Sequence, residues 1–278
     1  MTSLKSITWV LAACCLAAAI TSGPAPAQST TDYQPTVGQE GKDVIWVPTA
    51  QALVDRMLDM AKVTANDFVI DLGSGDGRTV ITAAKRGAKA LGIEYNPEMV
   101  ALSRRNATQE GVGDKADFMK ADLFESDLSQ ATVITMFLLP EINLQLRPKI
   151  LDLRPGTRVV SNSFNMGDWE ADETAQAKEG CTSYCKAFFW IVPAKAEGTW
   201  RMPEGELTLE QKYQTVSGTL KTKNGVTKVT NGKLRGDQIT FSAGNRQYTG
   251  RVGEDSMQGT SKSSGKEIKW EATAVRKT

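Results

Sequence analysis

The chain has 278 residues, a formal net charge of +1 and no histidine. This length is sufficient for more than one domain and for a full hydrophobic core. The near-zero net charge and the absence of a Lys/Arg-rich block argue against nucleic acid or another polyanion as a partner.

Residues 1–27 have the features of a secretory signal peptide. Lys5 is the only charged residue before position 28, residues 7–20 are almost all apolar, and Ala25-Pro26-Ala27 fits a cleavage site of small residues. We therefore expect an exported protein, periplasmic or secreted, with no membrane span after signal removal. Because the sequence before Cys14 also resembles a lipoprotein signal, a lipid anchor at Cys14 is the alternative.

Residues 28–43 are predicted to be a flexible lead-in, and residues 44–195 an α/β domain. An amphipathic helix around residues 53–61 is followed by alternating strand and helix patterns, which favour a parallel sheet covered by helices. The predicted strands are 68–71, 90–94, 117–120, 132–137, 158–161 and 186–192, and the predicted helices between them are 78–86, 97–110 and 142–151.

A glycine-rich turn at residues 71–78 is the most informative motif. It follows the apolar run Phe68-Val69-Ile70, reads Asp-Leu-Gly-Ser-Gly-Asp-Gly-Arg, and opens a predicted helix. Glycines there let a ligand approach the backbone closely, and the helix N-terminus offers unpaired N–H groups. Arg78 stands where a dinucleotide fingerprint has its third glycine, so an NAD site fits poorly.

Two further acidic residues follow neighbouring strands. Glu94 ends the second predicted strand, where a carboxylate can accept both hydroxyls of a ribose, and Asp122 follows the third. The carboxyl ends of parallel strands lie at one edge of a sheet, where open sheets bind ligands. The three motifs together predict a nucleoside-type site.

At these residues the chain resembles the class I, seven-strand S-adenosylmethionine-dependent methyltransferases. The version at 71–78 is most similar to a subgroup of small protein-lysine methyltransferases and their exported bacterial relatives, and the likeness covers about residues 44–194. It implies a Rossmann-like sheet, S-adenosylmethionine as cofactor and methyl transfer to a protein or small amine. The implied cofactor-binding residues are Asp71, Gly73, Ser74, Gly75, Asp76, Gly77, Glu94, Tyr95 and Asp122.

The methyl acceptor is less defined. The fourth predicted strand ends in Phe-Leu-Leu-Pro at 137–140, and not in the Asn-Pro-Pro-Tyr type of turn common in enzymes that methylate planar amides, which fits the lysine-directed resemblance. Candidate acceptor-pocket residues are Trp46, Thr49, Leu139, Pro140, Phe164 and Trp169. No residue identifies itself as a catalytic base. Because a secretory signal conflicts with a cytosolic cofactor, the alternative is an exported nucleotide-binding or scaffold protein without turnover.

Export affects the interpretation of the cysteines. Signal removal leaves only Cys181 and Cys185, and with no histidine in the chain this pair is a poor metal site, so no metal is expected. In an oxidising compartment the pair favours a disulfide across a short loop. Two buried thiols are the alternative.

Residues 196–278 have a different pattern. Short alternating segments, separated in part by Asn224-Gly225 and Asn231-Gly232, predict a small antiparallel all-β unit, with a faint resemblance to calycin-like half barrels. We expect Trp200 and Trp270 to lie in its core. This unit carries 14 basic and 9 acidic residues, against 18 and 23 in residues 28–195, which favours docking of the two parts.

Overall fold

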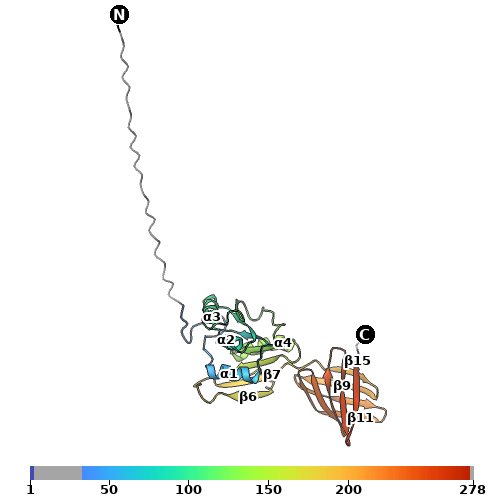
Figure 1. Cartoon of the computed structure of the whole chain (residues 1–278). Coiled ribbons are helices and arrows are strands. Elements are labelled where there is room, and N and C mark those ends of the chain that lie inside the picture. Colours follow the sequence, from blue (N-terminus) through green and yellow to red (C-terminus); the bar gives the residue numbers. More distant parts are fainter. Residues whose placement is uncertain (3–32, 276–278) are drawn as a thin grey trace. The chain divides into compact units, whose positions relative to one another are not determined.

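A computed structural model describes residues 1–2 and 33–275 of the chain (Figure 1). The predicted signal segment, with its charged Lys5, the candidate anchor Cys14 and the cleavage motif Ala25–Ala27, lies outside the described residues. Within the described part of the chain, no helix has both the length and the apolar character needed to cross a bilayer.

The first folded part is a seven-stranded mixed sheet with strand order β3-β2-β1-β4-β5-β7-β6 (Figure 1). Its strands are β1 (Phe68–Leu72), β2 (Lys89–Glu94), β3 (Ala116–Lys120), β4 (Val133–Met136), β5 (Arg158–Asn162), β6 (Glu173–Gln176) and β7 (Lys186–Ile191). Its helices are α1 (Gln51–Met60), α2 (Arg78–Lys85), α3 (Pro97–Gln109) and α4 (Pro140–Leu151). The expected Rossmann-like methyltransferase sheet is confirmed.

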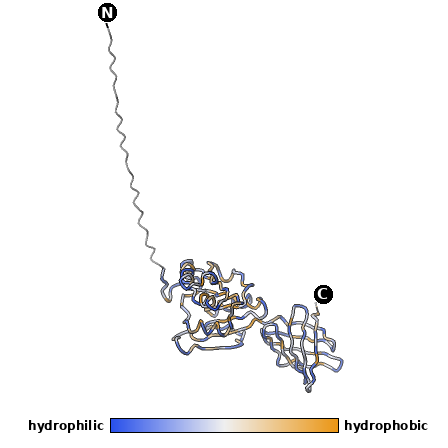
Figure 2. The backbone as a smooth tube through the Cα atoms, viewed as in Figure 1, coloured by the Kyte–Doolittle hydropathy of each residue, from blue (hydrophilic) through white to orange (hydrophobic). Residues whose placement is uncertain are grey.

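Helices cover both faces of this sheet because its strands are apolar on both sides. Side chains alternate across a strand, so Val69 and Ile70 of β1 enter different hydrophobic clusters. The Val69 cluster includes apolar residues of α1, α2 and α3, and the Ile70 cluster includes those of α4. Figure 2 shows the apolar residues of the chain as orange segments of the backbone.

The end of the sheet differs from the predicted pattern. The strand at 186–192 was predicted, but β7 runs antiparallel to β5, and β6 is a further strand paired with it. Residues of β6 are mostly exposed, and the strand has only four residues, so it carries no apolar alternation to reveal it. Because β7 is antiparallel, its first residue lies at the edge where β4 and β5 end.

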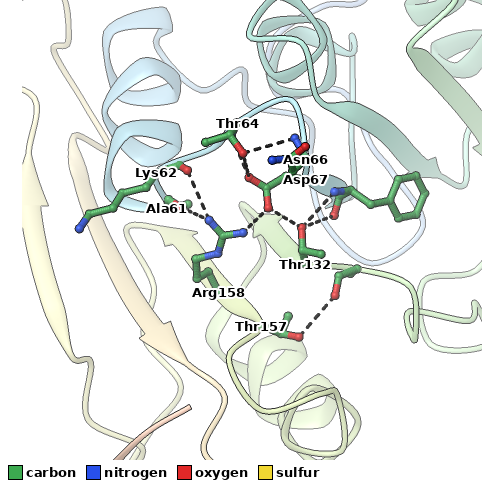
Figure 3. Close-up of polar contacts among 10 residues, drawn as sticks. Ala61, Lys62, Thr64, Asn66, Asp67, Thr132, Thr157 and Arg158 are labelled. Atoms are coloured by element: carbon green, nitrogen blue, oxygen red, sulfur yellow. Dashed lines mark hydrogen bonds and ion pairs between the residues drawn. The ribbon is translucent and has the colours of Figure 1, made fainter. Parts of the chain in front are cut away.

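A polar network fastens the opposite edge, where β1, β4 and β5 begin (Figure 3). The Arg158 guanidinium donates to Asp67 and to the Ala61 carbonyl oxygen, and Thr132 Oγ1 donates to Asp67 Oδ1 over 2.8 Å. Burial alone would raise the pKa of Asp67, but hydrogen bonds from Thr64, Thr132 and Arg158 outweigh it and hold that pKa below its usual value. The network joins α1 to the sheet on the side away from the glycine turn.

The second part is a closed antiparallel barrel of eight strands. Its strands are β8 (Gly198–Met202), β9 (Gly205–Lys212), β10 (Thr215–Thr222), β11 (Gly225–Arg235), β12 (Gln238–Ala243), β13 (Arg246–Val252), β14 (Ser256–Ser263) and β15 (Lys266–Ala274). Buried and exposed residues alternate along them, as one-sided burial requires. The expected all-β unit is confirmed, and it is a full barrel, not a half barrel.

Aromatic side chains fill the barrel interior. Trp200 and Trp270 are 3% and 5% exposed, as expected of core residues. Phe241 stacks on Tyr248 with ring centroids 4.6 Å apart, and both contact Trp270 at their edges. This interior is a packed core.

The two Asn-Gly pairs have different roles. Asn224-Gly225 joins β10 to β11 as a hairpin turn, as predicted. The prediction for Asn231-Gly232 was wrong, because both residues lie inside β11 at a shift of register with each neighbouring strand. Asn231 has a left-handed φ of 51°, so the pair forms a bulge that bends a long strand around the barrel.

Candidate functional site

A cavity of about 560 Å³ opens at the edge of the sheet where β1, β2 and β4 end. This volume lies within the range of about 300–1,000 Å³ that is usual for small-molecule sites. Three segments line it: the glycine turn, residues 39–49 ahead of α1, and the loops that carry Phe137, Phe164 and Tyr184.

The glycine turn between β1 and α2 needs glycine for two separate reasons. Gly75 has φ 55° and Gly77 has φ 84°, in the left-handed region. A Cβ at Gly75 would lie 2.6 Å from Trp46 Nε1, and one at Gly77 would lie 2.8 Å from the Phe118 ring. Neither position has space for a side chain, and the close packing sets the path of the turn beneath the cavity.

Asp71 lies at the end of β1, 6% exposed, and lines the cavity. Thr135 Oγ1 of β4 donates to its Oδ1 over 2.6 Å. Burial raises the pKa of this carboxyl to about 7, with hydrogen bonds from Thr135 and Thr79 opposing the rise and the nearby Asp76 carboxylate adding to it. A cation at this position would stabilise the ionised form.

Glu94, at the end of β2, is held by two backbone donors. The Gly75 N–H donates to Oε2 over 3.0 Å, and the Asn96 N–H donates to Oε1 over 2.9 Å. Each oxygen keeps acceptor capacity for a ligand hydroxyl. The neighbouring Tyr95 also lines the cavity and is 49% exposed.

Asp122, beyond β3, is paired with a residue that the sequence reasoning missed. Lys42 donates to Asp122 Oδ2, and the Phe124 N–H donates to Oδ1 over 2.9 Å. The hydrogen bond from Lys42 is the main reason that the pKa of Asp122 is lowered. The Lys42 ammonium also lies 5.0 Å from the centroid of the Tyr95 ring, so Lys42 covers the cavity beside both residues.

Lys42 belongs to the segment expected to be a loose lead-in. In the structure, Gln39 to Asp43 line the cavity. The Trp46 N–H donates to the Gln39 carbonyl over 2.9 Å, and the Gly38 N–H donates to the Trp46 carbonyl over 2.9 Å. These bonds form a short hairpin in a polar stretch that gives no strand signal.

The donor set of this cavity fits S-adenosylmethionine. Asp71, Glu94 and Asp122 would hold its ammonium, ribose hydroxyls and adenine amine, respectively. Ser74 Oγ is buried in the lining without a hydrogen-bond partner, and a buried hydroxyl of this kind is costly unless a ligand satisfies it. The remaining implied residues, Gly73, Asp76 and Tyr95, line the same cavity, while Gly77 packs behind the turn.

The acceptor-pocket candidates divide into two groups. Trp46, Thr49, Leu139 and Phe164 line the cavity, whereas Pro140 begins α4 and is not among the lining residues. The structure places Trp169 elsewhere. It is fully buried, its ring centroid is 6.0 Å from that of Trp190, and it belongs to the core cluster beneath α4. The tight turn between Met166 and Trp169 directs the indole into the core.

Two lining aromatics were missed. Phe137 was recognised only as the end of a strand, although residues at carboxyl ends of strands are site candidates on that ground alone. Tyr184 lies in the loop closed by the Cys181–Cys185 disulfide, which is present with a Cα–Cα distance of 5.8 Å. The predicted disulfide therefore belongs to the wall of the cavity.

Comparison with known proteins agrees with this geometry. The ANTKMT methyltransferase domain family matches residues 71–173. A protein-lysine N-methyltransferase of Saccharolobus islandicus is 46% identical over 140 residues, which are 49% of this chain and 87% of that protein. A human lysine N-methyltransferase named for ATP synthase is 37% identical over 128 residues, 46% of this chain and 54% of that protein, so the match spans about half of the human enzyme.

A solved structure is similar in the same region. It is described as an RNA methyltransferase from Salinibacter ruber in complex with S-adenosyl-L-homocysteine, and it is 45% identical with a TM-score of 0.50. The similarity covers 54% of this chain and 95% of that one. With the glycine turn, the three carboxylates and the seven-stranded sheet, these matches show that the chain belongs to the class I S-adenosylmethionine-dependent methyltransferases, in the protein-lysine methyltransferase family.

Proposed function

We propose that this protein transfers a methyl group from S-adenosylmethionine to the side-chain amine of a protein lysine. The observation that carries the proposal is one continuous cavity with two chemically different ends. One end has the carboxylates Asp71, Glu94 and Asp122, and the other has the aromatic rings of Phe137, Phe164 and Tyr184. The names of the archaeal and human relatives support lysine as the acceptor.

The reaction requires positioning more than acid–base chemistry. The cofactor supplies a methyl group on a sulfonium, which is already an activated electrophile. The amine lone pair forms the new N–C bond while the S–C bond breaks, its electron pair stays on sulfur, and a proton leaves the nitrogen for solvent. Holding donor and acceptor in line supplies most of the rate in such a reaction. No histidine is needed for this.

Several residues of this chain contribute to that positioning. Asp71 and Glu94 are fixed by hydrogen bonds from Thr135 Oγ1 and from the Gly75 N–H, so neither carboxylate has to reorganise to accept a ligand. Trp46, against Gly75, and Phe164 bring apolar surface to the cavity and exclude water from it.

A labelling experiment tests this proposal. The full chain is incubated with methyl-labelled S-adenosylmethionine and either lysine-rich proteins or RNA, and labelled residues are identified after hydrolysis. We expect methyl-lysine, and at least tenfold less of it with Glu94→Gln. Glu125→Gln, which removes the same charge from an exposed position, is the control and should match the wild type.

The alternative outcomes have distinct meanings. Label in RNA would give this protein the activity named for the Salinibacter relative. Cofactor binding without transfer to any acceptor would support the alternative of an exported nucleotide-binding or scaffold protein.

We also propose that the protein is exported, periplasmic or secreted, with cleavage after Ala27. The support is the sequence of residues 1–27 alone. Fractionation of the native host, with N-terminal sequencing of the mature chain, tests this. A chain that begins at Gln28 is expected, a chain beginning at Cys14 indicates the lipid-anchored alternative, and an uncleaved cytoplasmic chain contradicts export.

A further inference from the structure

Three aromatic rings from separate loops meet at the end of the cavity away from Glu94. Phe137 follows β4, Phe164 follows β5, and Tyr184 precedes β7. The Phe137 ring centroid lies 5.2 Å from that of Tyr184 and 6.1 Å from that of Phe164, and the Phe164–Tyr184 distance is 6.2 Å. We call these three residues the aromatic wall.

The aromatic wall is not part of the hydrophobic core. None of its members belongs to a core cluster of the described residues, and Tyr184 is 47% exposed. All three line the same cavity as Asp71. Partly exposed aromatic side chains grouped around a cavity are better explained by a ligand than by packing.

The backbone that carries the wall is strained at two points. Ser163, next to Phe164, has φ 60°, and Tyr184 has φ 54°, both in the left-handed region that non-glycine residues seldom adopt. The Ser163 N–H donates to the Lys186 carbonyl over 2.7 Å, which ties the two loops together. Such strain persists where the surrounding structure holds it and is concentrated at functional sites.

The disulfide is part of what holds Tyr184. It links Cys181 to Cys185, the residue after Tyr184, and closes the connection between β6 and β7. The Ala177 N–H donates to the Cys185 carbonyl over 2.9 Å, so the bonded cysteine is also fixed to the start of this connection. So short a loop adds little to global stability through chain entropy, and its effect is local.

We propose that the aromatic wall binds the alkylammonium group of the acceptor, and that the Cys181–Cys185 disulfide sets its affinity by holding Tyr184 in place. This inference deepens the proposed function by assigning its acceptor site. Ring faces attract ammonium groups, and lysine and its methylated forms all carry one. Reduction of the disulfide releases Tyr184 and weakens acceptor binding without changing the cofactor end.

A binding experiment tests the site without depending on turnover. The full chain, saturated with S-adenosylhomocysteine, is titrated with N-acetyl-trimethyllysine amide and with neutral N-acetyl-norleucine amide. We expect the ammonium probe to bind at least tenfold more tightly than the neutral probe. Tyr184→Leu should remove that preference, and Tyr184→Phe should keep it within about threefold, because the ring face remains.

The disulfide arm uses the Cys181→Ser/Cys185→Ser double variant and, separately, the wild type under a reductant. Both should weaken ammonium-probe binding at least threefold, with the dissociation constant of S-adenosylhomocysteine unchanged within twofold. Equal affinity of the two probes for the wild type, or an unchanged preference in Tyr184→Leu, overturns the aromatic site. Unchanged probe affinity after reduction overturns the role of the disulfide. If the probe behaves as expected but no methyl-lysine forms, the site stands and the proposed function fails.

Discussion

At the scale of single residues, Asp71 shows how burial prepares a carboxyl group for a cationic ligand. It is 6% exposed, near Asp76 and Glu94, and burial raises its pKa to about 7. The unfolded chain would lose this proton near pH 4. The folded, unliganded protein therefore keeps a proton that the unfolded chain releases between about pH 4 and 7, so this group lowers stability as pH rises through that range.

Binding of the cofactor should have the opposite pH dependence. The ionised carboxylate accepts from the ligand ammonium, so affinity for S-adenosylhomocysteine should rise as pH increases from 6 to 8. We expect a several-fold gain in the wild type, measured calorimetrically in buffers of equal ionic strength. Asp71→Asn should bind more weakly and lose most of this dependence. The same pH profile in both proteins would exclude Asp71 as its cause.

At the scale of structural elements, the glycine turn and the helix that follows it are fixed by packing. Gly77 is the residue before α2, and Phe118 and Ser103 occupy the space that a side chain would need. Gly111 also has a positive φ, of 69°, but nothing lies within 4 Å of its missing Cβ. The two positions separate backbone strain from steric clash.

Gly77→Ala should be more destabilising than Gly111→Ala. Both substitutions strain the backbone by about 1 kcal/mol, and only the first adds overpacking, of about 1–3 kcal/mol. Urea unfolding of the two variants measures the difference directly. Equal losses of unfolding free energy would show that Phe118 moves aside and that the turn is not tightly packed.

The network at the other edge of the sheet is a structural counterpart of the site (Figure 3). Asp67→Asn leaves the Arg158 guanidinium without its carboxylate and should lower unfolding free energy by about 3 kcal/mol at pH 7. The pKa of Asp67 is lowered on folding, so its contribution is complete above about pH 4 and is lost below that.

Two measurements check this prediction. Urea unfolding should show the gap between wild type and Asp67→Asn narrowing as pH falls below 4. The dissociation constant of S-adenosylhomocysteine for the folded variant should stay within twofold of the wild type. A large loss of affinity would mean that the two edges of the sheet are coupled.

The sequence predicts the elements whose chemistry is local. The glycine turn, Glu94 and Asp122 each follow a recognisable strand, so their common edge follows from parallel topology. It does not predict that Lys42 pairs with Asp122, 80 residues away, or that Tyr184 lies beside Phe137. Those contacts depend on how loops fold back over the sheet, and polar loops carry no periodic signal.

At the scale of the whole molecule, charged and aromatic contacts join the barrel strands to the sheet part. Lys212 lies 3.1 Å from Asp168, and Arg235 lies 3.2 Å from Glu173, which agrees with the expected charge complementarity. Tyr213 stacks on Trp169 with ring centroids 5.9 Å apart. None of these residues lines the cavity.

A chain that ends at Lys195 should therefore still bind S-adenosylhomocysteine within about threefold of the full chain. It should also be less soluble, because loss of Tyr213 uncovers the indole of Trp169. Circular dichroism and calorimetric titration of the truncated protein test this. A folded truncated chain without cofactor affinity would show that the barrel is required for the site.

The most direct test of the central claim is calorimetric titration of the full chain with S-adenosylmethionine and S-adenosylhomocysteine. Both should bind at a single site, and Asp71→Ala and Glu94→Ala should each weaken binding at least tenfold, or about 1.4 kcal/mol, because each removes a charged acceptor from a polar ligand. No binding to the folded wild type, or wild-type affinity in both variants, would contradict the assignment of this cavity to the cofactor.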